Sequence, residues 1–151
     1  MKGRRKARAV ALQALYEVDS SSHSPGTVLR QRLEATPLSD ELSRFAHQLM
    51  LGVLEHRQEL DRMIARYAPE WPVEQIALVD RNILRIALWE FAITGETPTS
   101  VAINEAVELA KAFGSETSPR FVNGVLGSLA EVAEGGASPK GKPESGELGT
   151  R

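Results

Sequence analysis

The chain has 151 residues, of which 42% are hydrophobic and 5% aromatic, with a formal net charge of -2 and no cysteine. This length predicts one compact domain, or two small ones that share a core. The lack of cysteine excludes disulfides, thiolate metal sites and cysteine nucleophiles. No apolar run approaches a membrane span of about 20 residues and no signal peptide is evident, so we expect a cytoplasmic protein with no membrane contact.

Positive charge is concentrated at the start of the chain. Five of the first eight residues are cationic, and the first acidic residue is Glu17. The five are Lys2, Arg4, Arg5, Lys6 and Arg8. The rest of the chain has 13 bases against 20 acids, a net charge of -7. A basic segment on an acidic protein favours a polyanionic partner such as nucleic acid, and the alternative is an ordinary solvated N-terminus.

Apolar residues recur at helical spacing through the first half. The pattern predicts a helix that ends near Asp19, and a short helix over 27–37. Residues 39–67 then predict one long helix or two helices in series. Ser39 is expected to cap this stretch through its own hydroxyl, because Glu41 is too near for a capping box.

Two prolines, Pro69 and Pro72, mark a boundary, and we predict a single domain over 1–134 with halves 1–68 and 73–134. Residues 73–93 are apolar on most sides, which is typical of a central, buried helix. Gly95 and Pro98 end this segment.

Two more helices are predicted before the chain loses its apolar residues. One begins at Ser100 and stops at Gly114, and the other begins at Ser118, whose hydroxyl is expected to cap it. Gly124 and Gly127 within the last helix suggest close packing there. The segment 135–151 is rich in glycine and proline and predicts a disordered tail. The fold class is therefore all-α, with six or seven helices.

No catalytic or metal-binding constellation emerges from the residue pattern. The three histidines, His23, His47 and His56, are scattered and do not form a metal-ligand motif. The acidic residues Asp80, Glu90 and Glu105 are expected to be helix-surface charges or ion-pair partners of Arg81 or Arg85. We therefore expect no enzyme activity, no metal and no cofactor.

The first helix carries a second stripe about 120° from its apolar face, at about 100° per residue. The stripe consists of Arg5, Arg8, Leu12 and Tyr16. One interpretation is a docking patch beside a cationic nucleic-acid contact, with the tyrosine as anchor. The other is packing of Leu12 and Tyr16 on a neighbouring element. If all five cations contact single-stranded RNA, the salt slope approaches -3.5, at about 0.7 per contact.

Segments spread over the chain resemble the NusB family of bacterial transcription antitermination factors. They are ARAVALQALY (7–16), VDRNILRIALWE (79–90), PTSVAINEAVELAK (98–111) and FVNGVL (121–126). The resemblance covers residues 4 to about 133. Residues 20–40 show no family motif, and Trp89 stands where the family more often has tyrosine.

The resemblance implies a non-enzymatic, all-helical protein of two subdomains that pairs with NusE, a protein shared with the small ribosomal subunit. In this family the pair binds boxA RNA in nascent ribosomal transcripts and helps RNA polymerase pass terminators. The implied RNA contacts are Lys2, Arg4, Arg5, Lys6 and Arg8, and the implied partner contacts are Leu12, Tyr16 and Asp80. Phe121 is a further candidate for RNA or partner contact, with a core position as its alternative.

Three other hypotheses compete with that of an RNA-binding adaptor. NusB-like domains also occur fused to RNA cytosine methyltransferases, but this chain lacks residues for a catalytic domain. A helical protein-interaction module with an incidental basic start would bind NusE and no RNA. A homodimer that hides the RNA surface is the third.

Overall fold

The computed structural model describes residues 2–68, 70 and 72–135, and this part of the chain is helical without strands, which confirms the all-α prediction. Seven α-helices follow one another: α1 (Lys2–Ser20), α2 (Pro25–Ala35), α3 (Asp40–Glu55), α4 (Arg57–Tyr67), α5 (Leu78–Leu88), α6 (Thr99–Phe113) and α7 (Ser118–Gly135). A 3₁₀ turn, η1 (Val73–Gln75), precedes α5, and a π turn, η2 (Trp89–Ile93), continues it. Apart from Gly135, the predicted tail lies outside the described residues.

Helix starts follow local chemistry, with two corrections. α2 begins with Pro25 in its first turn, before the predicted Thr27, because proline lacks the N–H that would be unpaired at that position. Ser39 caps α3 as expected, since its hydroxyl accepts a hydrogen bond from the Leu42 N–H at 3.2 Å. Ser118 begins α7, but its hydroxyl accepts instead from the Ser115 N–H in the preceding turn, at 2.8 Å.

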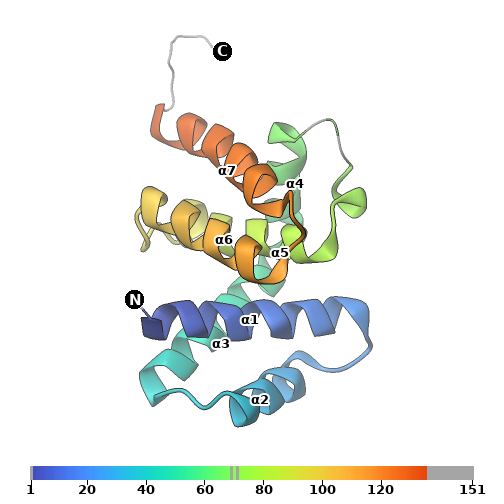
Figure 1. Cartoon of the computed structure of the whole chain (residues 1–151), viewed down its shortest axis with the longest axis vertical. Coiled ribbons are helices and arrows are strands. Elements are labelled where there is room, and N and C mark those ends of the chain that lie inside the picture. Colours follow the sequence, from blue (N-terminus) through green and yellow to red (C-terminus); the bar gives the residue numbers. More distant parts are fainter. Residues whose placement is uncertain (1, 69, 71, 136–151) are drawn as a thin grey trace.

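Helix α1 crosses the middle of the molecule (Figure 1). It packs against α2 and α3 on one side and against α5 on the other. Three buried alanines, Ala7, Ala11 and Ala14, let its neighbours approach closely. Because both sides of α1 are covered, most residues from Ala7 to Leu15 are buried.

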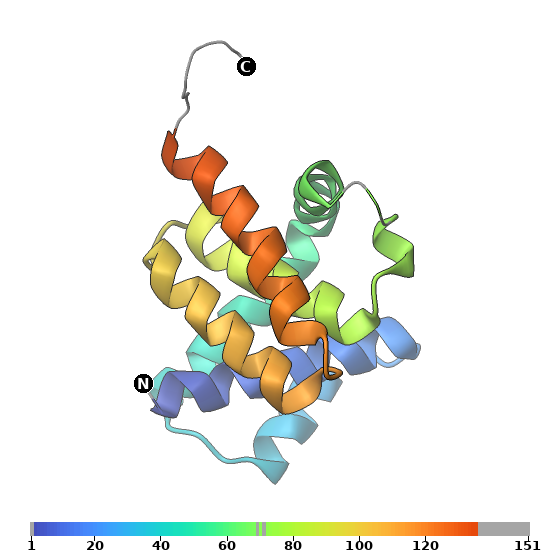
Figure 2. The same cartoon turned by 45° about the horizontal axis from the view of Figure 1, so that its top comes forward.

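Helix α4 packs mainly with helices that follow it in the chain. α4 packs mainly against α5 and α7, so it belongs with the later helices although it follows α3 directly (Figure 2). His56, the single residue between α3 and α4, lies outside both helices and lets the chain change direction. One hydrophobic core nevertheless runs through α1–α3 and α4–α7.

The segment 73–93 is the predicted central element, with residues Asn82–Leu88 all buried. Its π turn lies on α3 at Gly52, where a Cβ would overlap the Trp89 indole. The prediction of close packing at Gly124 and Gly127 is wrong, because a Cβ at either would meet nothing within 4 Å. Among the described residues, no helix is long and apolar enough to span a membrane.

Candidate nucleic-acid interface

Four cations are exposed on the first two turns of α1, and three of them, Lys2, Arg4 and Lys6, form no ion pair within the described residues. The Arg4 guanidinium lies over the Phe45 ring of α3, with its central carbon 4.3 Å from the ring centre. A helix N-terminus already carries partial positive charge, so these cations add to its field instead of neutralising it. Such an arrangement costs folding free energy and attracts anions, which favours a binding role over a structural one.

Arg5 lies beside these cations but forms an ion pair with Glu105 of α6. Its Nε and Nη2 donate to the two carboxylate oxygens at 3.0 and 2.9 Å. The Arg5 side chain remains 50% exposed while that of Glu105 is 6% exposed. These hydrogen bonds lower the pKa of Glu105 and raise the pKa of Arg5. Arg5 therefore presents part of its guanidinium to solvent while its charge is paired with Glu105.

Arg8 is buried, so the structure does not place it where RNA would contact it directly. Its Nε and Nη2 donate to the Glu90 carboxylate at 2.8 Å each, and both side chains are 2% exposed. The Thr97 hydroxyl donates to the same carboxylate at 2.7 Å. The Arg8 Nη1 also lies 3.7 Å from Glu105. This cluster ties α1 to η2 and α6, and it explains why a cation from the basic segment lies inside the fold.

The sequence pattern placed the partners of these carboxylates wrongly. Glu90 and Glu105 pair with arginines of α1, not with Arg81 or Arg85. Arg85 instead binds Asp61 of α4 through two hydrogen bonds of 2.8 and 2.9 Å, and Asp19 of α1 at 3.1 Å. The α1 partners stand 82 and 100 residues away along the chain, a separation at which helical periodicity carries no signal.

The second stripe of α1 splits between core and surface. Leu12 is 2% exposed and packs into the core, so a direct partner contact is not available to it, whereas Tyr16 is 43% exposed. Asp80 is 7% exposed, and its Oδ1 has no hydrogen-bond donor within the described part of the chain. Phe121 is half-buried against the edge of the core.

The histidines do not gather into a site. His23 lies 2.9 Å from the Glu17 carboxylate, and His56 lies 2.9 Å from the Gly52 carbonyl. Across the residues that the structure describes, no cluster of three histidines or carboxylates is arranged to hold a metal ion.

The described part of the chain is an all-α protein with a group of exposed cations at the N-terminus of its first helix. The chain belongs to the NusB family, whose model matches residues 5–131. The relatives that it matches are transcription antitermination proteins.

Several known proteins resemble it along most of their length. The NusB antitermination protein of Roseiflexus sp. (strain RS-1) is 53% identical over 128 residues, which cover 83% of this chain and 90% of that protein. That of Symbiobacterium thermophilum is 47% identical, covering 89% and 93%. The solved structure of T. maritima NusB superimposes with a TM-score of 0.78 at 32% identity, covering 85% and 90%. A crystal structure of the antitermination factors NusB and NusE in complex with double-stranded RNA gives a TM-score of 0.79 at 25% identity, covering 87% and 98%.

Proposed function

We propose that this protein is an antitermination adaptor of the cytoplasm that pairs with NusE and binds boxA RNA in nascent ribosomal transcripts, within the antitermination complex on RNA polymerase. The observation that carries the RNA contact is the group of exposed cations Lys2, Arg4 and Lys6 at the N-terminus of α1, with which no carboxylate among the described residues forms an ion pair. The similarity to a NusB that was crystallised with NusE and RNA supports the same roles here.

The proposed RNA surface consists of these three cations, with Arg5 contributing its exposed edge and Phe121 a further contact. Arg8 supports the surface from inside by fixing α1 to η2. Three free cations give a salt slope near -2 on single-stranded RNA, at about 0.7 per contact. So few phosphate contacts give low RNA affinity. A basic partner protein that binds the same RNA would contribute the additional contacts.

The proposed partner surface lies where α1 meets α5. Tyr16 is one turn before Asp19, and Asp19 accepts a hydrogen bond of 3.0 Å from Asn82 of α5. Asp80 lies two residues before Asn82 and has a carboxylate oxygen without a donor. The Tyr16 ring, which is 43% exposed, offers an amphipathic anchor, whereas Asp80, which is 7% exposed, would meet a partner only through the small part of it that reaches the surface.

The test is a titration of labelled boxA RNA with the protein, with and without purified NusE, across a salt series. The variant Lys2→Ala/Lys6→Ala removes two charges that no described residue pairs, so folding is preserved. We expect weaker binding and a salt slope shallower by about 1.4. The control Arg62→Ala/Arg66→Ala removes the same charge from the exposed surface of α4 and should leave the slope unchanged.

Absence of RNA binding with NusE present, or equal slopes in both double variants, would refute the RNA surface. Binding of NusE is measured separately with Tyr16→Ala and Asp80→Asn, each of which should weaken it without changing RNA binding by the protein alone. Light scattering accompanies both titrations, because a homodimer that covers the basic helix end is the competing arrangement.

A further inference from the structure

The Phe45 ring of α3 lies against two arginines of α1, Arg4 and Arg8. The central carbon of the Arg4 guanidinium is 4.3 Å from the ring centre, and that of Arg8 is 5.3 Å from it. An aromatic ring attracts a cation within about 6 Å of its centre, so both contacts are favourable. Positions 4 and 8 are one helical turn apart on the same face of α1, which lets one ring meet both. Phe45 therefore connects an exposed cation of α1 with a buried one.

The two arginines differ in how they are held. Arg8 is 2% exposed, and two hydrogen bonds to the Glu90 carboxylate fix its guanidinium. Arg4 is exposed, and its guanidinium forms no hydrogen bond or ion pair with any other residue that the structure describes. Its N–H groups are therefore available to a ligand, and the contact that restricts its position is the one with the Phe45 ring.

The backbone of α1 also lies close to α3 at this point. A Cβ on Gly3 would lie 2.7 Å from the Leu42 Cδ1, closer than side chains normally approach. Leu42 and Phe45 are three residues apart on α3 and therefore lie on the same face of that helix. The lack of a side chain at Gly3 lets α1 come near enough for Arg4 to reach the ring.

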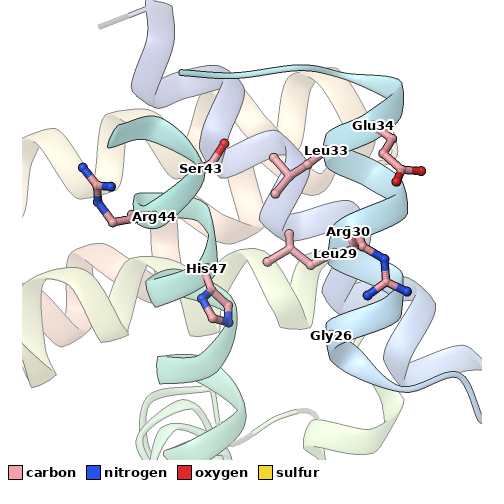
Figure 3. Close-up of a pocket in the computed structure, with 8 residues that line it drawn as sticks. All are labelled: Gly26, Leu29, Arg30, Leu33, Glu34, Ser43, Arg44 and His47. Carbon is pink, nitrogen blue, oxygen red and sulfur yellow. The ribbon is translucent and has the colours of Figure 1, made fainter. Parts of the chain in front are cut away.

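The other exposed cations nearby lack such support. Within the described part of the chain, neither Lys2 nor Lys6 lies over an aromatic ring. Figure 3 shows the residue before Phe45, Arg44, with its guanidinium on the outer side of α3, away from the leucines that α2 contributes to the hollow between these helices. A long cationic side chain loses rotamer freedom when it binds a ligand, whereas Arg4 has already lost part of that freedom on folding.

We propose that Phe45 is a positioning residue for RNA binding, whose ring holds the Arg4 guanidinium in place before a phosphate of the RNA reaches it. This inference rests on the proposed RNA-binding function and names a residue of α3 that controls the cationic surface of α1. The ring carries no net charge, so it holds the cation without neutralising it. Loss of the ring should therefore lower the RNA affinity and leave the number of released counterions unchanged, whereas loss of Arg4 should lower both.

The experiment measures the binding of labelled boxA RNA to the full chain in the presence of NusE, across a salt series. Phe45→Leu removes the ring and keeps an apolar side chain at this half-buried position. We expect binding about threefold to tenfold weaker, the factor that corresponds to ordering one flexible side chain, at an unchanged salt slope. Phe45→Tyr keeps the ring and should bind like the wild type. Arg4→Ala should make the slope shallower by about 0.7.

Two double-mutant cycles separate positioning from a general loss of structure. In the Arg4→Ala background, Phe45→Leu should no longer weaken RNA binding, because no guanidinium remains for the ring to hold. In the matched Lys6→Ala background it should weaken binding by the same factor as in the wild type, since the effects of uncoupled sites add. Circular dichroism checks that the variants remain helical. If Phe45→Leu loses helix, Phe45→Met replaces it in both cycles, because methionine adapts to irregular gaps.

Equal losses from the Phe45 change in the two backgrounds would show that the ring acts through the fold and would overturn the inference. Wild-type affinity in Phe45→Leu, or an equal loss in Phe45→Tyr, would overturn it as well. In each of these cases the wild type still binds RNA, so the proposed function stands. If the wild type binds no RNA with NusE present, the proposed function itself fails.

Discussion

Arg5 and Arg8 come from the same basic segment and yet face different environments. Arg8 is 2% exposed and shares its carboxylate partner with Thr97, whereas Arg5 remains half-exposed on its own pair with Glu105. The buried pair fixes the position of α1, and the half-exposed pair limits how much charge Arg5 offers to RNA. One carboxylate on α6 therefore adjusts the strength of the cationic surface.

Replacing Glu105 by glutamine should release the charge of Arg5. The salt slope for RNA binding is expected to steepen by about 0.7, and binding at low salt should tighten, because one more cation becomes free to displace counterions. Fluorescence anisotropy across a salt series measures both. Glu108→Gln is the control, since it removes one charge from the same helix, where Glu108 pairs with Lys111 at 3.2 Å and acts on Arg5 only through the longer-range field. Its change in slope should be much smaller. Equal slopes for wild type and Glu105→Gln would show that Glu105 does not neutralise Arg5.

The same pair predicts a dependence of stability on pH. Arg5 lowers the pKa of Glu105 in the folded protein below the value of about 4.3 expected when unfolded. A lowered folded pKa contributes stability above the unfolded pKa, and that contribution disappears as the pH falls through the folded value. The stability difference between wild type and Glu105→Gln should therefore be largest near neutral pH and shrink below about pH 4. Urea denaturation at several pH values measures it, and a constant difference would contradict the assignment.

Truncation of Arg8 should destabilise the fold far more than truncation of an exposed cation. Arg8→Ala leaves the Glu90 carboxylate buried without its counterion, which costs about 3–5 kcal/mol of unfolding free energy. The double variant Arg8→Ala/Glu90→Gln should recover part of this loss, because no charge remains buried and the amide oxygen still accepts from Thr97. Chemical denaturation of the two variants measures both losses of unfolding free energy. A loss below about 1 kcal/mol for Arg8→Ala would mean that water reaches Glu90.

At the scale of the helices, a glycine in α3 is closely packed whereas one in α7 is not. Gly52 lets the Trp89 indole lie directly on α3, while Gly124 in α7 faces open space. Both occur in helices where glycine lowers intrinsic stability, so the difference comes only from what approaches each position.

Alanine should therefore act oppositely at the two glycines. Gly52→Ala is expected to destabilise by about 1–3 kcal/mol through overlap with Trp89. Gly124→Ala should stabilise by about 0.5–1 kcal/mol, because alanine restricts the unfolded chain and fits the helix. Thermal and urea denaturation of both variants give the signs. Stabilisation by Gly52→Ala would show that the indole moves away without cost.

At the scale of the whole molecule, the two groups of helices are held by charge as well as by a shared core. Asp19, at the end of α1, accepts hydrogen bonds from Arg57 of α4 at 2.8 Å and from Asn82 and Arg85 of α5 at 3.0 and 3.1 Å. Since the apolar core is continuous through both groups, neither would retain a complete interior alone.

Unfolding should therefore be a single cooperative transition. We expect far-UV circular dichroism and tryptophan fluorescence to give coincident urea curves. Arg85→Ala should lower the midpoint by leaving Asp19 and Asp61 without their shared cation, while the two curves still coincide. Separate transitions in either protein would show that α1–α3 and α4–α7 unfold independently.

The sequence alone determined the helical class, the order of the helices, the burial of α5 and the cluster of positive charge at the N-terminus. These properties follow from hydrophobic periodicity, breaker residues and charge counts, all of which act locally. The family segments in turn identified the relatives.

The tertiary structure decided which cations of the basic segment are free. Arg8 and Leu12 are buried because α1 is covered on two sides, and Arg5 meets Glu105 because α6 crosses near the start of α1. It also decided that α4 joins the later helices and that Gly52, not Gly124, marks a close contact. Each of these outcomes depends on how helices distant in the chain cross one another, and the spacing of residues within one helix carries no information about that crossing.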